Sequence, residues 1–142
     1  MTPPGAGPAA GRQDGAVTPF DRMGGAPFFT DLVHAFYQGV ATDPVLTRMY
    51  PEDDLGPAEE RFRLFLMQYW GGPSTYSDER GHPRLRMRHA PYVIDDDARD
   101  RWVGHMQAAL DTVGPAHGLA PELRAELWRY LTSSAIAMVN SP

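Results

Sequence analysis

The chain is organised around the stretch Gly81-His82-Pro83-Arg84-Leu85-Arg86-Met87-Arg88-His89-Ala90-Pro91-Tyr92. Together with Arg80 just before it, this stretch holds four arginines and two histidines within thirteen residues. Proline restricts the backbone at its own position and at the residue before it, so Pro83 and Pro91 are expected to bound one short basic helical turn. His89 falls at the end of that turn, where an imidazole can be presented to a neighbouring group. The local charge alone permits a nucleic-acid patch as well as a ligand site.

Working outward, the composition fits one domain that does not bind nucleic acid. The chain has 142 residues and a formal net charge of −5, which argues against a general nucleic-acid partner. No apolar run approaches the roughly 18 residues of a membrane span, and the first residues lack the pattern of a secretory signal. We therefore expect a soluble, cytoplasmic protein with no membrane partner.

Two residue types are absent from the chain. It has no cysteine, which excludes disulfides, thiolate catalysis and covalent c-type haem attachment. It also has no lysine, so all thirteen basic residues are arginine. Because this uniform choice fits the coding bias of a G+C-rich genome, arguments that prefer arginine over lysine at single positions carry little weight here.

The first residues differ from the rest of the chain. Residues 1–17 are rich in proline, glycine and alanine and have too few large apolar side chains to offset chain entropy, so we expect a disordered extension. The folded domain is then expected to span residues 18–142. It begins with Thr18-Pro19-Phe20-Asp21, which has the form of a helix-capping box followed by a short helix that ends at Gly24-Gly25.

The remaining pattern predicts an all-α domain of five or six helices. A helix from Pro27 shows one apolar face, with Phe28, Phe29, Leu32, Val33, Phe36, Tyr37 and Val40. Further helices are expected after the Asp43-Pro44 cap, from Gly56-Pro57 to Gly71-Gly72, from the Asp95-Asp96-Asp97 cap to Gly114-Pro115, and from Pro121 onward. Ser74 to His82 is expected to be a loop.

The polar and aromatic residues leave two interpretations open. Each of the five histidines, His34, His82, His89, His105 and His117, is either a ligand or an ordinary hydrogen-bonded side chain, and none forms a zinc-hydrolase pair. No serine lies in a Gly-x-Ser-x-Gly nucleophile elbow. Tyr37, Tyr50 and Trp102 either pack in the core or bring their polar hydrogens together in a cavity.

Four motifs together resemble the group II, or O-type, truncated haemoglobins of bacteria. They are Tyr50-Pro51-Glu52-Asp53-Asp54-Leu55, Gln68-Tyr69-Trp70-Gly71-Gly72-Pro73, Tyr76-Ser77, and the stretch from Arg80 to Pro91, and the likeness runs from about Phe20 to Pro142. The resemblance implies a two-over-two helical sandwich around haem b, with sharp turns at the two glycine pairs Gly24-Gly25 and Gly71-Gly72.

The same resemblance implies roles for individual residues. His89 would be the proximal iron ligand and the metal site, and Tyr37, Tyr50 and Trp102 would be the polar distal residues that stabilise a bound ligand. Arg88 and Arg61 match positions near the haem propionates, and the distal helix would contribute Ala58, Phe62 and Phe65. Phe62 departs from the family pattern, in which leucine is common, and this puts ligand access in question.

The expected function is reversible binding of dioxygen, nitric oxide or another diatomic ligand at a five-coordinate iron, for oxygen transport, storage or sensing. The alternative is a redox enzyme that uses the same haem, either a nitric oxide dioxygenase or a peroxidase-like activity, with an unidentified reductase as partner. A more distant alternative is a haem-free helical interaction module. The sequence leaves open whether the chain forms a homo-oligomer.

Overall fold

The computed structural model describes residues 17–50, 54–80 and 94–140. Within these ranges every regular element is a helix, which confirms the all-α prediction. The helices are α1 (Pro19–Arg22), α2 (Gly25–Val40), α3 (Pro44–Thr47), α4 (Gly56–Tyr69), α5 (Thr75–Arg80), α7 (Asp96–Ala116) and α8 (Pro121–Met138). The described residues thus hold seven helices, where five or six were expected for the chain.

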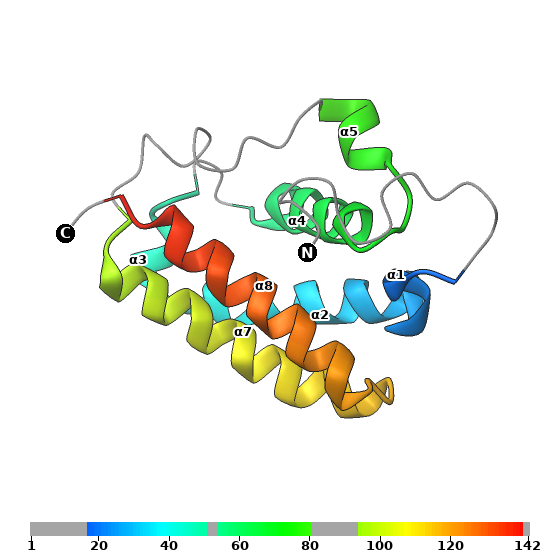
Figure 1. The fold of residues 1–142 in the computed structure, drawn as a ribbon. Coiled ribbons are helices and arrows are strands. Elements are labelled where there is room, and N and C mark those ends of the chain that lie inside the picture. Colours follow the sequence, from blue (N-terminus) through cyan, green and yellow to red (C-terminus); the bar gives the residue numbers. More distant parts are fainter. Residues whose placement is uncertain (1–16, 51–53, 81–93, 141–142) are drawn as a thin grey trace.

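The four long helices form two pairs. α7 and α8 lie side by side and run in opposite directions, and α2 packs against both α4 and α7 (Figure 1). The seven apolar residues predicted for one face of α2 are all buried, so this helix lies at the centre of the core. The core also takes residues from α4, α7 and α8, namely Ala58, Phe65, Leu66, Met67, Ala98, Met106, Ala109, Leu110, Val113, Leu123, Leu127 and Leu131.

The first turn of the fold follows the predicted capping box. Asp21 N donates a hydrogen bond to Thr18 Oγ1, and Thr18 N donates one to Asp21 Oδ2, both at a distance of 3.1 Å. Two glycines with positive φ, Gly24 at 116° and Gly25 at 68°, then redirect the chain into α2. Because side chains with a Cβ rarely adopt this conformation, the sharp turn between α1 and α2 depends on glycine.

One predicted loop is partly helical. Within Ser74 to His82, Thr75–Arg80 forms α5. Gln68 at the end of α4 holds this helix with two hydrogen bonds. Its Oε1 accepts from Ser77 N at 2.9 Å, and its Nε2 donates to Ser77 Oγ at 2.7 Å. Tyr76 is buried against the ring of Phe65. The helix is therefore stabilised by tertiary contacts that local propensity does not contain.

A second correction concerns the end of α7. Gly114-Pro115 was expected to end this helix, yet α7 continues to Ala116 and is capped by His117. The His117 ring packs edge-on against Phe28, and its Nε2 lies 2.8 Å from Asp31 Oδ2. These contacts with α2 hold the last turn in place after the proline.

Candidate functional site

The structure brings together three of the predicted polar residues and Phe62 from four elements. Tyr37 lies in the last turn of α2, Tyr50 follows α3, Phe62 lies in α4, and Trp102 lies in α7. The hydroxyl oxygens of Tyr37 and Tyr50 are 3.3 Å apart, within hydrogen-bonding distance. We call Tyr37, Tyr50, Phe62 and Trp102 the distal cluster.

Phe62 links the members of the distal cluster. Its ring centroid lies 6.2 Å from Tyr37 and 6.1 Å from Trp102, in edge-on or tilted arrangements. Phe36 packs beneath, with ring centroids 5.7 Å from Phe62 and 5.1 Å from Trp102. Edge-to-face packing at these distances is favourable, so the rings support one another's orientation.

Phe36 was predicted only as a core residue of α2, and its contacts make it the floor of the distal cluster. Sequence reasoning missed this role because a buried phenylalanine on an apolar helix face looks like any other core position. Its place directly before Tyr37 was the one available signal.

Burial decides the protonation of the two phenols. Burial raises the pKa of both Tyr37 and Tyr50 above the usual value of 10, and the neighbouring Tyr50 phenol raises the pKa of Tyr37 further. The positive charge of the Arg61 guanidinium lowers the pKa of both phenols, in opposition to burial. Both phenols therefore keep their protons at neutral pH and can act as hydrogen-bond donors.

The other predicted residues of α4 occupy one side of that helix. Ala58 and Phe65 are buried, whereas Arg61 and Phe62 are half-buried. Among the described residues the Phe65 ring packs against Tyr69 and Tyr76, so its ring contacts lie outside the distal cluster. His89 and Arg88 lie outside the described residues.

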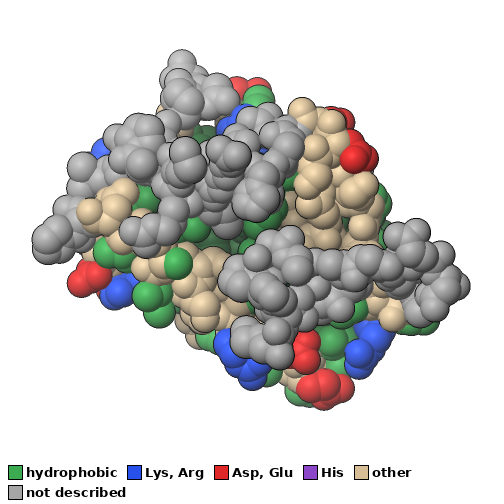
Figure 2. Space-filling view, turned by 45° about the horizontal axis from the view of Figure 1, so that its top comes forward, with side chains coloured by type: hydrophobic (Ala, Val, Ile, Leu, Met, Phe, Trp, Pro, Cys, Tyr) green, Lys and Arg blue, Asp and Glu red, His purple; other side chains and the backbone are tan. Residues whose placement is uncertain are grey.

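The surface of the distal cluster suits a flat, largely apolar group. Tyr50, Phe62 and Trp102 pack against the core and are half-buried, so part of each side chain stays exposed. The Tyr37 and Tyr50 hydroxyls meet in this cluster, and the positive charge of Arg61 acts on both phenols. On the face seen in Figure 2, hydrophobic side chains appear in the middle as well as near the edges, whereas charged ones lie mostly at the edges. The residues present therefore fit haem, which has an apolar ring and two anionic propionates.

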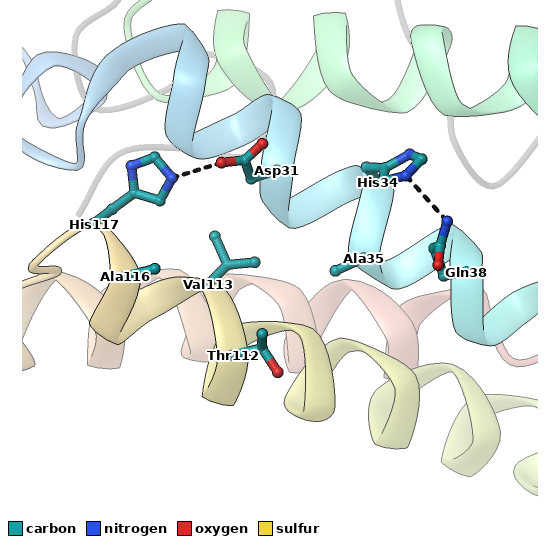
Figure 3. A pocket seen from close by; sticks show the side chains of 8 residues that line it. All are labelled: Asp31, His34, Ala35, Gln38, Thr112, Val113, Ala116 and His117. Atoms are coloured by element: carbon teal, nitrogen blue, oxygen red, sulfur yellow. Dashed lines mark hydrogen bonds and ion pairs between the residues drawn. The ribbon is translucent and has the colours of Figure 1, made fainter.

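A separate groove of about 370 Å³ lies between α2 and α7 (Figure 3). It is lined by Asp31, His34, Ala35, Gln38, Thr112, Val113, Ala116 and His117, of which only His34 and His117 were considered as possible ligands in the sequence. The His34 ring nitrogens lie 3.1 Å from Glu59 Oε2 and 3.1 Å from Gln38 Nε2. The described histidines His34, His105 and His117 are thus hydrogen-bonded side chains, as the structural interpretation expected.

The described part of the chain contains neither a group of side chains that could bind a metal ion nor a helix that could span a membrane. No group of three or more histidine, aspartate or glutamate residues in residues 17–50, 54–80 and 94–140 could hold a metal ion. None of the helices in these ranges is both long enough and apolar enough to cross a membrane.

Comparison with known proteins supports the resemblance seen in the sequence. The family model for bacterial-like globins matches residues 18–140. A group 2 truncated hemoglobin of Bacillus subtilis is 38% identical over 122 residues, which cover 86% of this chain and 88% of the relative.

Solved structures show the same fold. A thermostable hemoglobin of the actinobacterium Thermobifida fusca has a TM-score of 0.83 and 60% identity, with coverage of 89% of this chain and 99% of that chain. A truncated oxygen-avid haemoglobin of Bacillus subtilis has a TM-score of 0.79 and 38% identity, with coverage of 87% and 100%. The residues matched by the family model, 18–140, include all the described helices and the four residues of the distal cluster.

Proposed function

Because the chain belongs to the bacterial-like globins, and among them to the group II truncated haemoglobins, we propose that it holds haem b and reversibly binds dioxygen and other diatomic ligands. The observation that carries this proposal is the distal cluster, in which two protonated phenols and an indole from three parts of the chain gather beside Phe62 of α4. The name of the Bacillus subtilis structure describes that relative as oxygen-avid, which supports dioxygen as the ligand to test first.

The residues of the distal cluster supply hydrogen bonds. Haem provides an iron with an open coordination position for a diatomic ligand. Each phenol has one proton, and the Tyr37–Tyr50 contact uses only one of the two. The second O–H can therefore be donated to a ligand, as can the Trp102 N–H, while Phe62 and Phe36 exclude water from around these donors.

The proximal side of the proposal rests on the family resemblance. His89 is proposed as the iron ligand, with Arg88 and Arg61 near the propionates and with Ala58 and Phe65 along the distal helix. A neutral imidazole is the usual proximal ligand in globins, and arginine pairs well with a carboxylate.

The test is haem reconstitution of the full chain, followed by absorption spectra of the ferric and ferrous forms with and without dioxygen. A strong haem band and a reversible change with dioxygen are expected. His89→Ala should weaken haem retention, and added imidazole should restore the ferrous spectrum. His82→Ala is the matched control, because it removes a histidine from the same stretch and should leave the spectrum unchanged. Equal behaviour of the two variants would refute His89 as the ligand, and a chain that takes up no haem would refute the function.

A nitric oxide assay separates ligand binding from the redox alternative. Mixing the dioxygen-loaded protein with nitric oxide and a reductase should give one stoichiometric reaction if the chain mainly binds and releases ligand. Sustained turnover would instead support the enzyme.

A further inference from the structure

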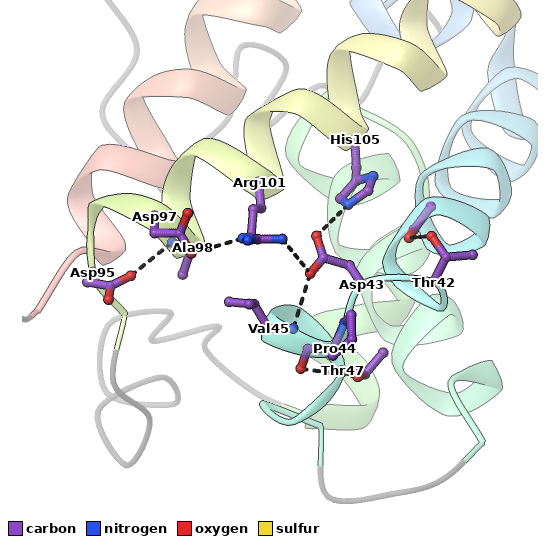
Figure 4. Close-up of polar contacts among 11 residues, drawn as sticks. Thr42, Asp43, Pro44, Val45, Thr47, Asp95, Asp97, Ala98, Arg101 and His105 are labelled. Carbon is purple, nitrogen blue, oxygen red and sulfur yellow. Dashed lines mark hydrogen bonds and ion pairs between the residues drawn. The ribbon is translucent and has the colours of Figure 1, made fainter.

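Asp43 is a buried carboxylate that joins two distant parts of the chain. It is the N-cap of α3, where Asp43 Oδ1 accepts a hydrogen bond from Val45 N at a distance of 3.1 Å. The same carboxylate accepts two hydrogen bonds from α7, one from Arg101 Nη1 at 3.2 Å and one from His105 Nε2 at 2.9 Å (Figure 4). Its side chain is only 7% exposed. One carboxylate therefore caps the N-terminus of α3 and connects it to α7.

The position of this contact ties it to the distal cluster. Asp43 lies between Tyr37 and Tyr50 in the sequence, on the segment that holds the phenol pair. Arg101 and His105 lie on either side of Trp102 in α7. The hydrogen bonds to Asp43 thus connect the segment that carries the phenols with the helix that carries the indole.

His105 is held from a second direction by Gly39 of α2. A Cβ placed on Gly39 would lie 2.5 Å from His105 Nδ1 and 3.1 Å from His105 Cγ, so the imidazole packs directly against the α2 backbone. Thr42 Oγ1 donates to Gly39 O over 2.8 Å and braces the same end of the helix. The ring has little freedom to move without breaking its contact with Asp43.

We propose that Asp43, His105, Arg101 and Gly39 form a latch that sets the separation between the Tyr37–Tyr50 pair and Trp102. This proposal rests on the proposed function, because it treats Asp43 as a positioning residue for ligand stabilisation. A hydrogen bond weakens steeply once its atoms separate beyond about 3.5 Å, so a shift of well under 1 Å between the two segments would weaken donation to a ligand.

Asp43→Ser tests the latch while keeping the helix cap, because serine is also a favoured cap residue but is too short to reach α7. Asp97→Ser is the matched control. Asp97 Oδ2 accepts from Arg101 Nε at 2.9 Å, but both residues lie on α7, so this hydrogen bond joins no second element. Both variants remove one carboxylate from Arg101, and only one of them opens the latch.

The expected result has two parts. Asp43→Ser should speed oxygen dissociation by about two- to thirtyfold, whereas Asp97→Ser should stay within about twofold of wild type. In a Trp102→Phe background, Asp43→Ser should have a smaller effect, because the part that acts through the indole N–H is gone. An effect of full size in that background would overturn the proposal.

A second readout does not require ligand binding. The indole N–H resonance of Trp102, assigned with Trp102→Phe, should shift in Asp43→Ser and not in Asp97→Ser. An unchanged resonance together with an unchanged dissociation rate would overturn the latch, even if the variant unfolds more easily. If the chain took up no haem, the proposed function would fail while this resonance still tested the latch. Should Asp43→Ser not fold, His105→Phe keeps a ring against Gly39, removes the donated hydrogen bond, and is expected to shift the same resonance.

Discussion

Replacement of the two phenols tests how the distal cluster donates hydrogen bonds. The hydroxyl oxygens of Tyr37 and Tyr50 are 3.3 Å apart and share two protons, one of which lies between them. The pair can therefore offer a ligand one donor, and a hydrogen bond to a charged acceptor contributes roughly 1.5–3 kcal/mol. Loss of that donor should speed oxygen dissociation by about ten- to 150-fold.

The phenol of the pair that does not donate to the ligand supports the donating phenol through their shared hydrogen bond. Removing it breaks a neutral hydrogen bond worth about 0.5–1.5 kcal/mol, so its own variant should change the rate by about two- to twelvefold. We therefore expect one of the variants Tyr37→Phe and Tyr50→Phe to show the larger increase in the oxygen dissociation rate and the other to show the smaller increase. The double variant should resemble the more severe single variant, because the two hydroxyls act in series.

The test is a double-mutant cycle, in which stopped-flow measurement gives the oxygen dissociation rate of wild type, both single variants and the double variant. Tyr130→Phe is the control, since this half-buried phenol of α8 stacks on Tyr69 at 4.0 Å and belongs to another aromatic group. Its removal should leave the rate unchanged. If both single variants were strongly impaired and their effects multiplied in the double variant, two independent donors would be present and the reasoning from the shared proton would be refuted.

Three further predictions concern access and stability. Phe62→Leu should speed ligand entry and lower the free energy of unfolding by about 1 kcal/mol through lost ring contacts, as measured by flash photolysis and denaturant unfolding; unchanged entry would show that Phe62 does not control access. Thr18→Ala should lower the free energy of unfolding by about 1 kcal/mol and Thr18→Ser should restore most of it; equal loss in both would contradict the cap. The hydrogen bond from His105 holds the pKa of Asp43 below its usual value of 3.8, so the stability it contributes is present above about pH 4 and is lost as the pH falls further. The difference in unfolding free energy between wild type and Asp43→Asn should therefore shrink below about pH 4, and a constant difference would argue against this assignment.

Local chemistry explains which elements could be predicted from the sequence. The Thr18 and Asp43 caps and the apolar face of α2 were all correctly predicted, because each depends on residues within one or two turns. α5 was missed because its stability comes from Gln68 and from the burial of Tyr76. The length of α7 was underestimated because contacts with α2 hold the turn after the proline.

The candidate site shows the same division. From the residues alone, Tyr37, Tyr50 and Trp102 could have been three separate core side chains, and only the family resemblance favoured convergence. In the structure Tyr37 and Trp102 pack against Phe62, and Tyr50 packs against Tyr37. No spacing rule in the sequence could show this, since the four residues come from four separate parts of the chain. The roles proposed for His89 and Arg88 remain predictions.

Asp43 shows why a correct local prediction can still miss a function. Aspartate before proline is a strong signal for a helix cap, and the cap is formed. A cap needs one acceptor oxygen, however, and a carboxylate can accept several hydrogen bonds, so the remaining capacity of Asp43 is taken up by Arg101 and His105. A cap alone would tolerate serine or asparagine with little loss. The contact with α7 requires the length and charge of aspartate, so the penalty of Asp43→Ser beyond that of an ordinary cap substitution measures what the latch contributes.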